Sequence, residues 1–94
     1  MKNVHLDSFE EMSDYLRNNK ESFFGLIIEG VKQCIEDGVE LIDIIHFFVK
    51  DTKIVIQVKK DDWNTTLLLA LEYFESVEDY EKCIEIKNLI NNIK

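Results

Sequence analysis

Hydrophobic residues recur at helical spacing in two stretches of the first 38 residues. Residues 9–18 are predicted to form a short helix, because Ser8 and Glu11 have the spacing of a capping box at its start. A second helix is expected from Ser22 to Gly38, since glycine suits the left-handed residue that ends many helices. The apolar faces consist of Phe9, Met12 and Leu16 in the first helix and of Phe24, Ile27, Ile28, Val31 and Ile35 in the second.

Two glycines, Gly25 and Gly30, lie inside the second predicted helix. Each costs about 1 kcal/mol of helix stability relative to alanine, so a structural reason for them is expected. We interpret both as positions where this helix packs closely against a neighbouring element.

The period of the pattern changes after residue 38. Apolar and polar side chains alternate in residues 53–59, with Ile54, Ile56 and Val58 on one face, which predicts a half-buried strand. The preceding run, residues 41–49, is rich in β-branched and aromatic residues, and a polar turn joins the two runs. We therefore expect an antiparallel β-hairpin, although residues 41–49 also fit the period of a helix.

Two further helices are expected after residue 60. Asp61 or Asp62 is suited to cap the first of them, and residues 76–79 break the pattern and offer a new N-cap. Their apolar faces are Trp63, Thr66, Leu67, Ala70, Leu71 and Phe74, followed by Tyr80, Cys83, Ile86, Ile90 and Ile93. The prediction is a single small α+β domain, residues 1–94, in the order α-α-β-β-α-α. Helices pack the β-hairpin in residues 1–60, and residues 61–94 form a C-terminal αα-hairpin.

Composition narrows the possible functions. The chain has 94 residues and a net charge of −8, with a single arginine, so direct nucleic-acid binding is not expected. No apolar run reaches the roughly 18–20 residues that cross a membrane, and residues 1–7 do not begin a signal peptide. Two widely separated cysteines match neither a disulfide framework nor a zinc site. A cytoplasmic protein is expected, and its abundant Ile, Lys and Asn suggest an AT-rich bacterial or phage genome.

Residues that carry catalytic chemistry are few. His46 lies in the predicted strand 41–49 and is interpreted as a packed or edge residue, with a general base or ligand beside Asp43 as the alternative. Cys34 and Cys83 fall on apolar helix faces, where cysteine behaves as a small hydrophobic residue. No glycine-rich phosphate loop or nucleophile elbow is present in the sequence. We expect no enzyme activity, no cofactor and no metal site.

Apolar and acidic residues outside the predicted core indicate an interface. Large apolar residues that fall off the core faces often mark a contact surface. Carboxylates crowd the last helical hairpin, where they form a solvated face or an anionic surface for a basic partner. Local pairing of Glu78 with Lys82 at i, i+4 would weaken such a surface. The candidate interface residues are Phe23, Phe47, Leu68, Leu69, Tyr73, Glu75, Glu78 and Glu81.

The last predicted helix has an aromatic residue, an acid, an aliphatic residue and a base at Tyr80, Glu81, Ile86 and Lys87. In these positions residues 67–93 resemble the UVR motif, a helical hairpin of bacterial excision-repair nuclease subunits and of some protease-adaptor proteins. The motif's Ala pair is replaced by Cys83 and Ile84, and its Asp by Asn88. The resemblance implies protein–protein contact through an αα-hairpin, without catalysis.

These observations favour a small acidic protein-binding module, a phage or bacterial regulator or inhibitor that acts by contact with another protein. A homodimer would also bury the apolar residues. Two alternatives stay open: a self-associating structural or assembly component, and an acidic DNA mimic that inhibits a nucleic-acid-binding protein.

Overall fold

The computed structural model describes residues 2–93 of the chain. Its fold is α+β, as predicted, but the order is β-α-α-β-β-α-α, with one strand more than the sequence pattern indicated. The elements are β1 (Lys2–Leu6), α1 (Phe9–Asn18), α2 (Lys20–Asp37), β2 (Leu41–Val49), β3 (Thr52–Lys59), the short 3₁₀-helix η1 (Lys60–Asp62), α3 (Trp63–Ser76) and α4 (Tyr80–Asn92). No helix within residues 2–93 has the length and apolar character needed to cross a lipid bilayer.

The three strands form one mixed sheet in the order β1-β2-β3. β2 and β3 make the predicted antiparallel hairpin, in which Val49 pairs with Thr52 across a two-residue turn. The strand missing from the prediction is β1, which runs parallel to β2 from Lys2 opposite Ile45 to Leu6 opposite Val49. β1 is short and half polar, so its own pattern is weak. Its pairing with β2, far away in the sequence, makes it a strand.

A β-bulge in β2 decides which of its side chains face the helices. The register shifts between Asp43 and Ile45, so Ile44 is an extra residue without a partner in β3. One extra residue reverses the alternation of a strand. After the bulge, Ile45 and Phe47 face the helices and are fully buried, while His46 lies on the opposite face. Phe47 is therefore a core residue, and its prediction as an interface residue is wrong.

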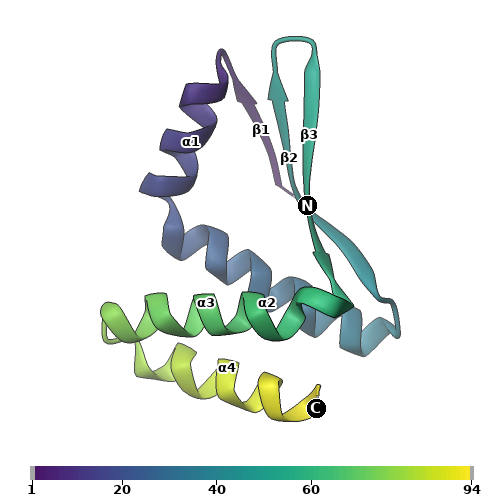
Figure 1. Cartoon of the computed structure of the whole chain (residues 1–94), viewed down its shortest axis with the longest axis vertical. Coiled ribbons are helices and arrows are strands. Elements are labelled where there is room, and N and C mark those ends of the chain that lie inside the picture. Colours follow the sequence, from purple (N-terminus) through teal and green to yellow (C-terminus); the bar gives the residue numbers. More distant parts are fainter. Residues whose placement is uncertain (1, 94) are drawn as a thin grey trace.

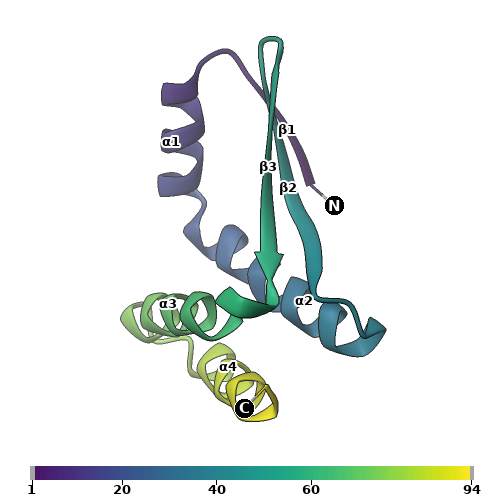
Figure 2. The ribbon, with the colours of Figure 1, turned by 45° about the vertical axis from the view of Figure 1, so that its right-hand side comes forward.

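α1 and α2 are the helices that pack against the sheet, and α3 and α4 lie beyond its lower end in Figure 1 and Figure 2. α1 lies beside one face of the sheet, where the rings of Tyr15 and Phe47 meet edge to face with centroids 5.6 Å apart. α2 passes below the sheet, and α3 and α4 follow it as an antiparallel pair. The largest fully buried side chains are Ile28, Val31, Cys34, Ile45, Phe47, Val49, Leu67, Phe74 and Ile86. One core thus joins the sheet to the C-terminal hairpin.

The two glycines inside α2 have different surroundings. A Cβ at Gly30 would lie 3.0 Å from Cγ2 of Ile44 and 3.5 Å from Cγ2 of Ile42, so α2 packs closely on the sheet there. A Cβ at Gly25 would meet no atom within 4 Å. Close packing is confirmed for Gly30 and is wrong for Gly25.

Local capping chemistry sets the starts of α1 and α4 and the end of α2, whereas α2 and α3 begin without a side-chain cap hydrogen bond. The hydroxyl of Ser8 accepts a hydrogen bond from the backbone N–H of Glu11 at 3.2 Å, as the capping box predicts. Asp79 caps α4 by accepting from the backbone N–H of Lys82 at 3.3 Å. Gly38 ends α2 with the expected left-handed φ of 68°. α2 itself starts at Lys20, before the predicted cap.

Three apolar residues at helix ends are exposed, although the sequence pattern placed them on apolar faces: Phe9, Ile35 and Tyr80. Phe9 and Tyr80 are the first residues of their helices, and Ile35 lies in the last turn of α2. The neighbouring elements do not cover these terminal turns.

Candidate functional site

The structure divides the predicted apolar interface residues between the core and one surface. Phe47 is in the core, and Phe23 is half-buried on α2. Leu68 and Leu69 on α3 remain 49% and 53% exposed, and Tyr73 on the same helix is half-buried. The apolar surface that the sequence predicted therefore centres on α3.

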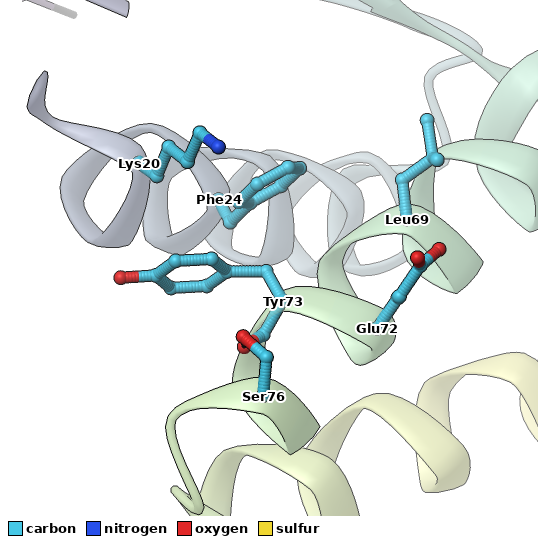
Figure 3. Close-up of a pocket in the computed structure, with 6 residues that line it drawn as sticks. All are labelled: Lys20, Phe24, Leu69, Glu72, Tyr73 and Ser76. Carbon is cyan, nitrogen blue, oxygen red and sulfur yellow. Dashed lines mark hydrogen bonds between the residues drawn. The ribbon is translucent and has the colours of Figure 1, made fainter. Parts of the chain in front are cut away.

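A groove of about 320 Å³ lies between the start of α2 and the end of α3 (Figure 3). The rings of Phe24 and Tyr73 stack along it, with centroids 5.4 Å apart and an interplanar angle of 28°. Leu69 lies one turn before Tyr73 and extends the apolar wall. The hydroxyl of Ser76 donates to the carbonyl oxygen of Tyr73 at 2.6 Å and holds the last turn of α3 together. A cavity of this size accommodates a large apolar side chain or a small apolar ligand.

The charged residues that line this groove are Glu72 of α3 and Lys20 of α2. α3 contains Glu72 and Glu75 and no basic residue. Glu72 lines the groove, with its carboxylate on the α3 side in Figure 3. Lys20 is the single cation among the lining residues and comes from the first turn of α2. The site therefore combines an apolar wall with negative charge on one side and one positive charge on the other.

The three acidic residues predicted for the interface lie around the connection between α3 and α4. Glu75, Glu78 and Glu81 are exposed. The expected pairing of Glu78 with Lys82 is wrong, because Glu78 lies outside both helices with a left-handed φ of 60°. Lys82 instead pairs with Glu85 at 3.5 Å. Within residues 2–93, no ion pair neutralises these three predicted carboxylates.

Glu85 also joins α4 to α2. Its carboxylate accepts a hydrogen bond from Nζ of Lys32 at 3.1 Å. This hydrogen bond, with the negative charges of Glu85 and Glu29, raises the pKa of Lys32 above its ordinary value. The charge of Glu85 therefore pairs with a lysine of α2, whereas no ion pair of the charged groove residues is described within residues 2–93.

On the sheet face opposite the helices, Asp43, His46 and Gln57 form a hydrogen-bonded group. Nε2 of Gln57 donates to Oδ1 of Asp43 at 2.8 Å, and Nε2 of His46 lies 3.3 Å from Oδ2. The hydrogen bond from Gln57, followed by the one from His46, lowers the pKa of the Asp43 carboxyl.

His46 itself is 8% exposed and packs edge-on against Phe48, so it is a packed strand residue, as predicted. Its one described hydrogen bond within residues 2–93 goes to a carboxylate. This arrangement orients an imidazole but places no nucleophile beside it. The residues that line the α2–α3 groove do not include His46.

Both cysteines are free and buried, as small hydrophobic residues are. Burial raises the pKa of the Cys34 thiol, with a further contribution from the charge of Asp37. A raised pKa suppresses the reactive thiolate at neutral pH. Within residues 2–93, His, Cys, Asp and Glu form no group of three or more that is arranged to hold a metal ion.

Several groove residues were not predicted as site residues. Phe24 was assigned to the core face of the second helix, yet it is half-buried and forms a wall of the groove. Glu72 belongs to the carboxylates that crowd the last helical hairpin but was not chosen as an interface residue, and Lys20 and Ser76 had no distinguishing signal in the sequence. Sequence spacing does place Leu69, Glu72, Tyr73 and Ser76 on one side of α3. The helix that faces them could not be identified from spacing within a single element.

No protein-family model, no curated protein and no solved structure matches this chain significantly.

Proposed function

We propose that this chain is a small protein-binding module that regulates or inhibits another protein by occupying part of its surface. The supporting observation is on α3, where Leu69 lines the groove and stays about half exposed, and the next residue along the chain, Leu68, is also about half exposed. Leu67 and Ala70 on the same helix are fully buried, whereas Leu68 and Leu69 do not belong to the core cluster. Clustered apolar residues beside a concave, aromatic-lined site are typical of binding surfaces.

The chemistry of the groove defines the segment that it fits. A large apolar side chain of the partner packs against the stacked rings of Phe24 and Tyr73 and on Leu69. A lysine or arginine residue that flanks this side chain lies near Glu72. The net charge of −8 also raises the association rate of a basic partner through long-range attraction.

One further feature supports protein contact, and another supports a cytoplasmic location. The α3–α4 hairpin presents Leu68 and Leu69, and residues 67–93 resemble the UVR-type hairpin, which implies protein contact. Both thiols are free, as expected for a protein of the reducing cytoplasm. We therefore place this module in the cytoplasm, bound to a protein with a basic and apolar contact segment.

Affinity capture from a bacterial lysate tests this proposal when it compares three forms of the chain. These forms are the wild type, Leu69→Ser at the groove, and Ile84→Ser as the matched control. Ile84 is 62% exposed on α4 and does not line the groove. We expect a protein that the wild type and Ile84→Ser capture and that Leu69→Ser loses. Equal capture by the wild type and Leu69→Ser, or no capture at all, would overturn the proposal.

The same material separates the two alternative functions. Light scattering that gives a concentration-dependent mass, abolished by Leu69→Ser, would show that the groove binds a second copy. A captured DNA-binding protein that DNA displaces, with no effect of Leu69→Ser, would indicate a DNA mimic that acts through its carboxylates.

A further inference from the structure

We propose that the outer edge of β3 is a second binding site, at which an acidic, extended segment of another protein adds a strand to the sheet. This site is separate from the α2–α3 groove and has the opposite charge. It requires no contribution from Leu69 or its neighbours.

Every second residue of β3 directs its backbone N–H and C=O away from β2, where a fourth strand could pair with them. Thr52 pairs with Val49 across the two-residue turn, so its N–H and C=O point toward β2, and the backbone groups of every second residue do the same. The N–H of Lys60 fits this alternation, since it donates to the carbonyl of Glu40 at 2.9 Å. The residues between them point outward: Lys53, Val55, Gln57 and Lys59.

These outward groups lie on an open edge. β3 is the last strand of the sheet, and no backbone hydrogen bond on its outer side is described within residues 2–93. The strand contains no proline and no bulge on its own side of the ladder, so nothing interrupts its row of donors and acceptors. An edge of this kind pairs readily with an extended segment.

Side chains on both faces of β3 leave space for those of an added strand. The side chains of its four outward residues are exposed on the sheet face that has no helix. On the helix face, Ile54 and Ile56 are only half-buried, because they lie at the rim of the core. Apolar side chains at alternate positions of the added strand would cover these two isoleucines and extend the core.

The charge of this edge selects an acidic partner. Residues 50–60 carry four lysines and one aspartate, a charge of +3, so the rest of the chain carries −11. Of the four lysines, Lys60 pairs with Glu40 at 3.6 Å, whereas no ion pair of Lys53 or Lys59 is described within residues 2–93, and Nζ of Lys53 lies 5.9 Å from the Phe48 ring centroid. An acidic segment is therefore repelled by most of the molecule and attracted to β3.

The same lysines disfavour a second copy of the chain at this edge. Pairing two β3 strands brings two positively charged strands together, and like charges on adjacent strands are destabilising. Edge lysines are a common protection against such self-pairing. An acidic strand removes this repulsion, with acidic residues opposite Lys53 and Lys59 and therefore six positions apart.

A capped peptide, TEVTIVVET, provides the probe for this site. Its two glutamates lie six positions apart, and its β-branched residues face Ile54 and Ile56 in an antiparallel pairing. The control peptide TKVTIVVKT has the same pattern with reversed charge. We expect the acidic peptide to bind with a Kd on the order of 10–100 µM by fluorescence anisotropy, as suits a small interface. The lysine peptide should bind at least about tenfold more weakly.

Amide hydrogen exchange followed by NMR identifies the mode of binding. The peptide should protect the outward N–H groups of Lys53, Val55, Gln57 and Lys59, a pattern that binding elsewhere does not produce. The double variant Lys53→Glu/Lys59→Glu should lose about tenfold or more in affinity. Lys82→Glu/Lys87→Glu makes the same change of charge on α4 and should lose much less.

Three results would overturn the site on β3. They are no binding at a peptide concentration of about 1 mM, equal binding of the two peptides, and protection at the α2–α3 groove in place of β3. Leu69→Ser should leave peptide binding unchanged, so this experiment and the capture experiment fail independently of each other.

Discussion

Replacing Glu78 with glycine should stabilise this protein. Glu78 follows α3 with a left-handed φ of 60°. The N–H of Asp79 bonds the carbonyl of Phe74 at 2.9 Å, and the N–H of Glu78 bonds that of Glu75 at 3.2 Å. These two bonds form a Schellman motif, in which the left-handed position usually holds glycine. Gly38 occupies the corresponding position of α2, with a φ of 68°.

The expected gain follows from the backbone conformation. A residue other than glycine costs roughly 1–2 kcal/mol in the left-handed region. Glycine offsets about 0.4–1 kcal/mol of this gain, because it increases the entropy of the unfolded chain. The negative charge of Glu78 has two opposing effects on stability. It is unfavourable after the C-terminus of α3 and favourable before the N-terminus of α4. We therefore expect Glu78→Gly to raise the free energy of unfolding by about 1 kcal/mol.

Thermal and urea denaturation measured by circular dichroism test this expectation. For a domain of this size, about 1 kcal/mol raises Tm by roughly 4–8 °C. The urea midpoint should rise at constant slope. Glu78→Ala removes the charge and keeps the left-handed strain, so it should change Tm little. Gly38→Ala should destabilise by about 1 kcal/mol, and a Cβ there meets no atom within 4 Å. An equal rise in Glu78→Ala and Glu78→Gly would refute the backbone explanation.

Three other measurements test the packing and the titrating groups. Gly30→Ala should lower the free energy of unfolding by about 1 kcal/mol because the methyl group overpacks the sheet contact. Gly25→Ala should raise it by about 0.5–1 kcal/mol, and urea titrations with shifts of the same sign would contradict this difference. The pKa of Asp43 is lowered, so its stabilising effect is present above the ordinary carboxyl pKa and is lost as the pH falls through the folded-state pKa. A carboxyl NMR titration should show this lowered pKa, and Gln57→Leu should return it toward its ordinary value. Alkylation of Cys34 at neutral pH should require opening of the fold, because the thiol is buried and its pKa is raised, and fast labelling of the native protein would contradict this.

Two of the six groove residues, Leu69 and Tyr73, could be predicted from α3 alone. Leu68, Leu69 and Tyr73 fall beside the core face of their helix, and the structure leaves them exposed or half-buried. The groove also needs Phe24 and Lys20 from α2, a helix more than forty residues earlier in the chain. The angle and position at which two helices pack depend on both surfaces, so spacing within one helix does not identify the opposite wall.

The sequence by itself determined the features that arise within one element or one turn: the helical periods, the alternation in β3, and the caps at Ser8 and Gly38. These features depend on side chains and backbone groups within a few residues of each other, so local chemistry is sufficient. Only the tertiary structure decided that Lys2–Leu6 is a strand, since its hydrogen-bond partners lie in β2. It also decided which side chains of β2 face the core, because the extra residue Ile44 reverses the alternation and directs Phe47 into the core. The first outcome follows from pairing between segments far apart in the sequence and the second from the register of the β2–β3 hairpin, and the free energy of each pairing depends on which residues lie opposite.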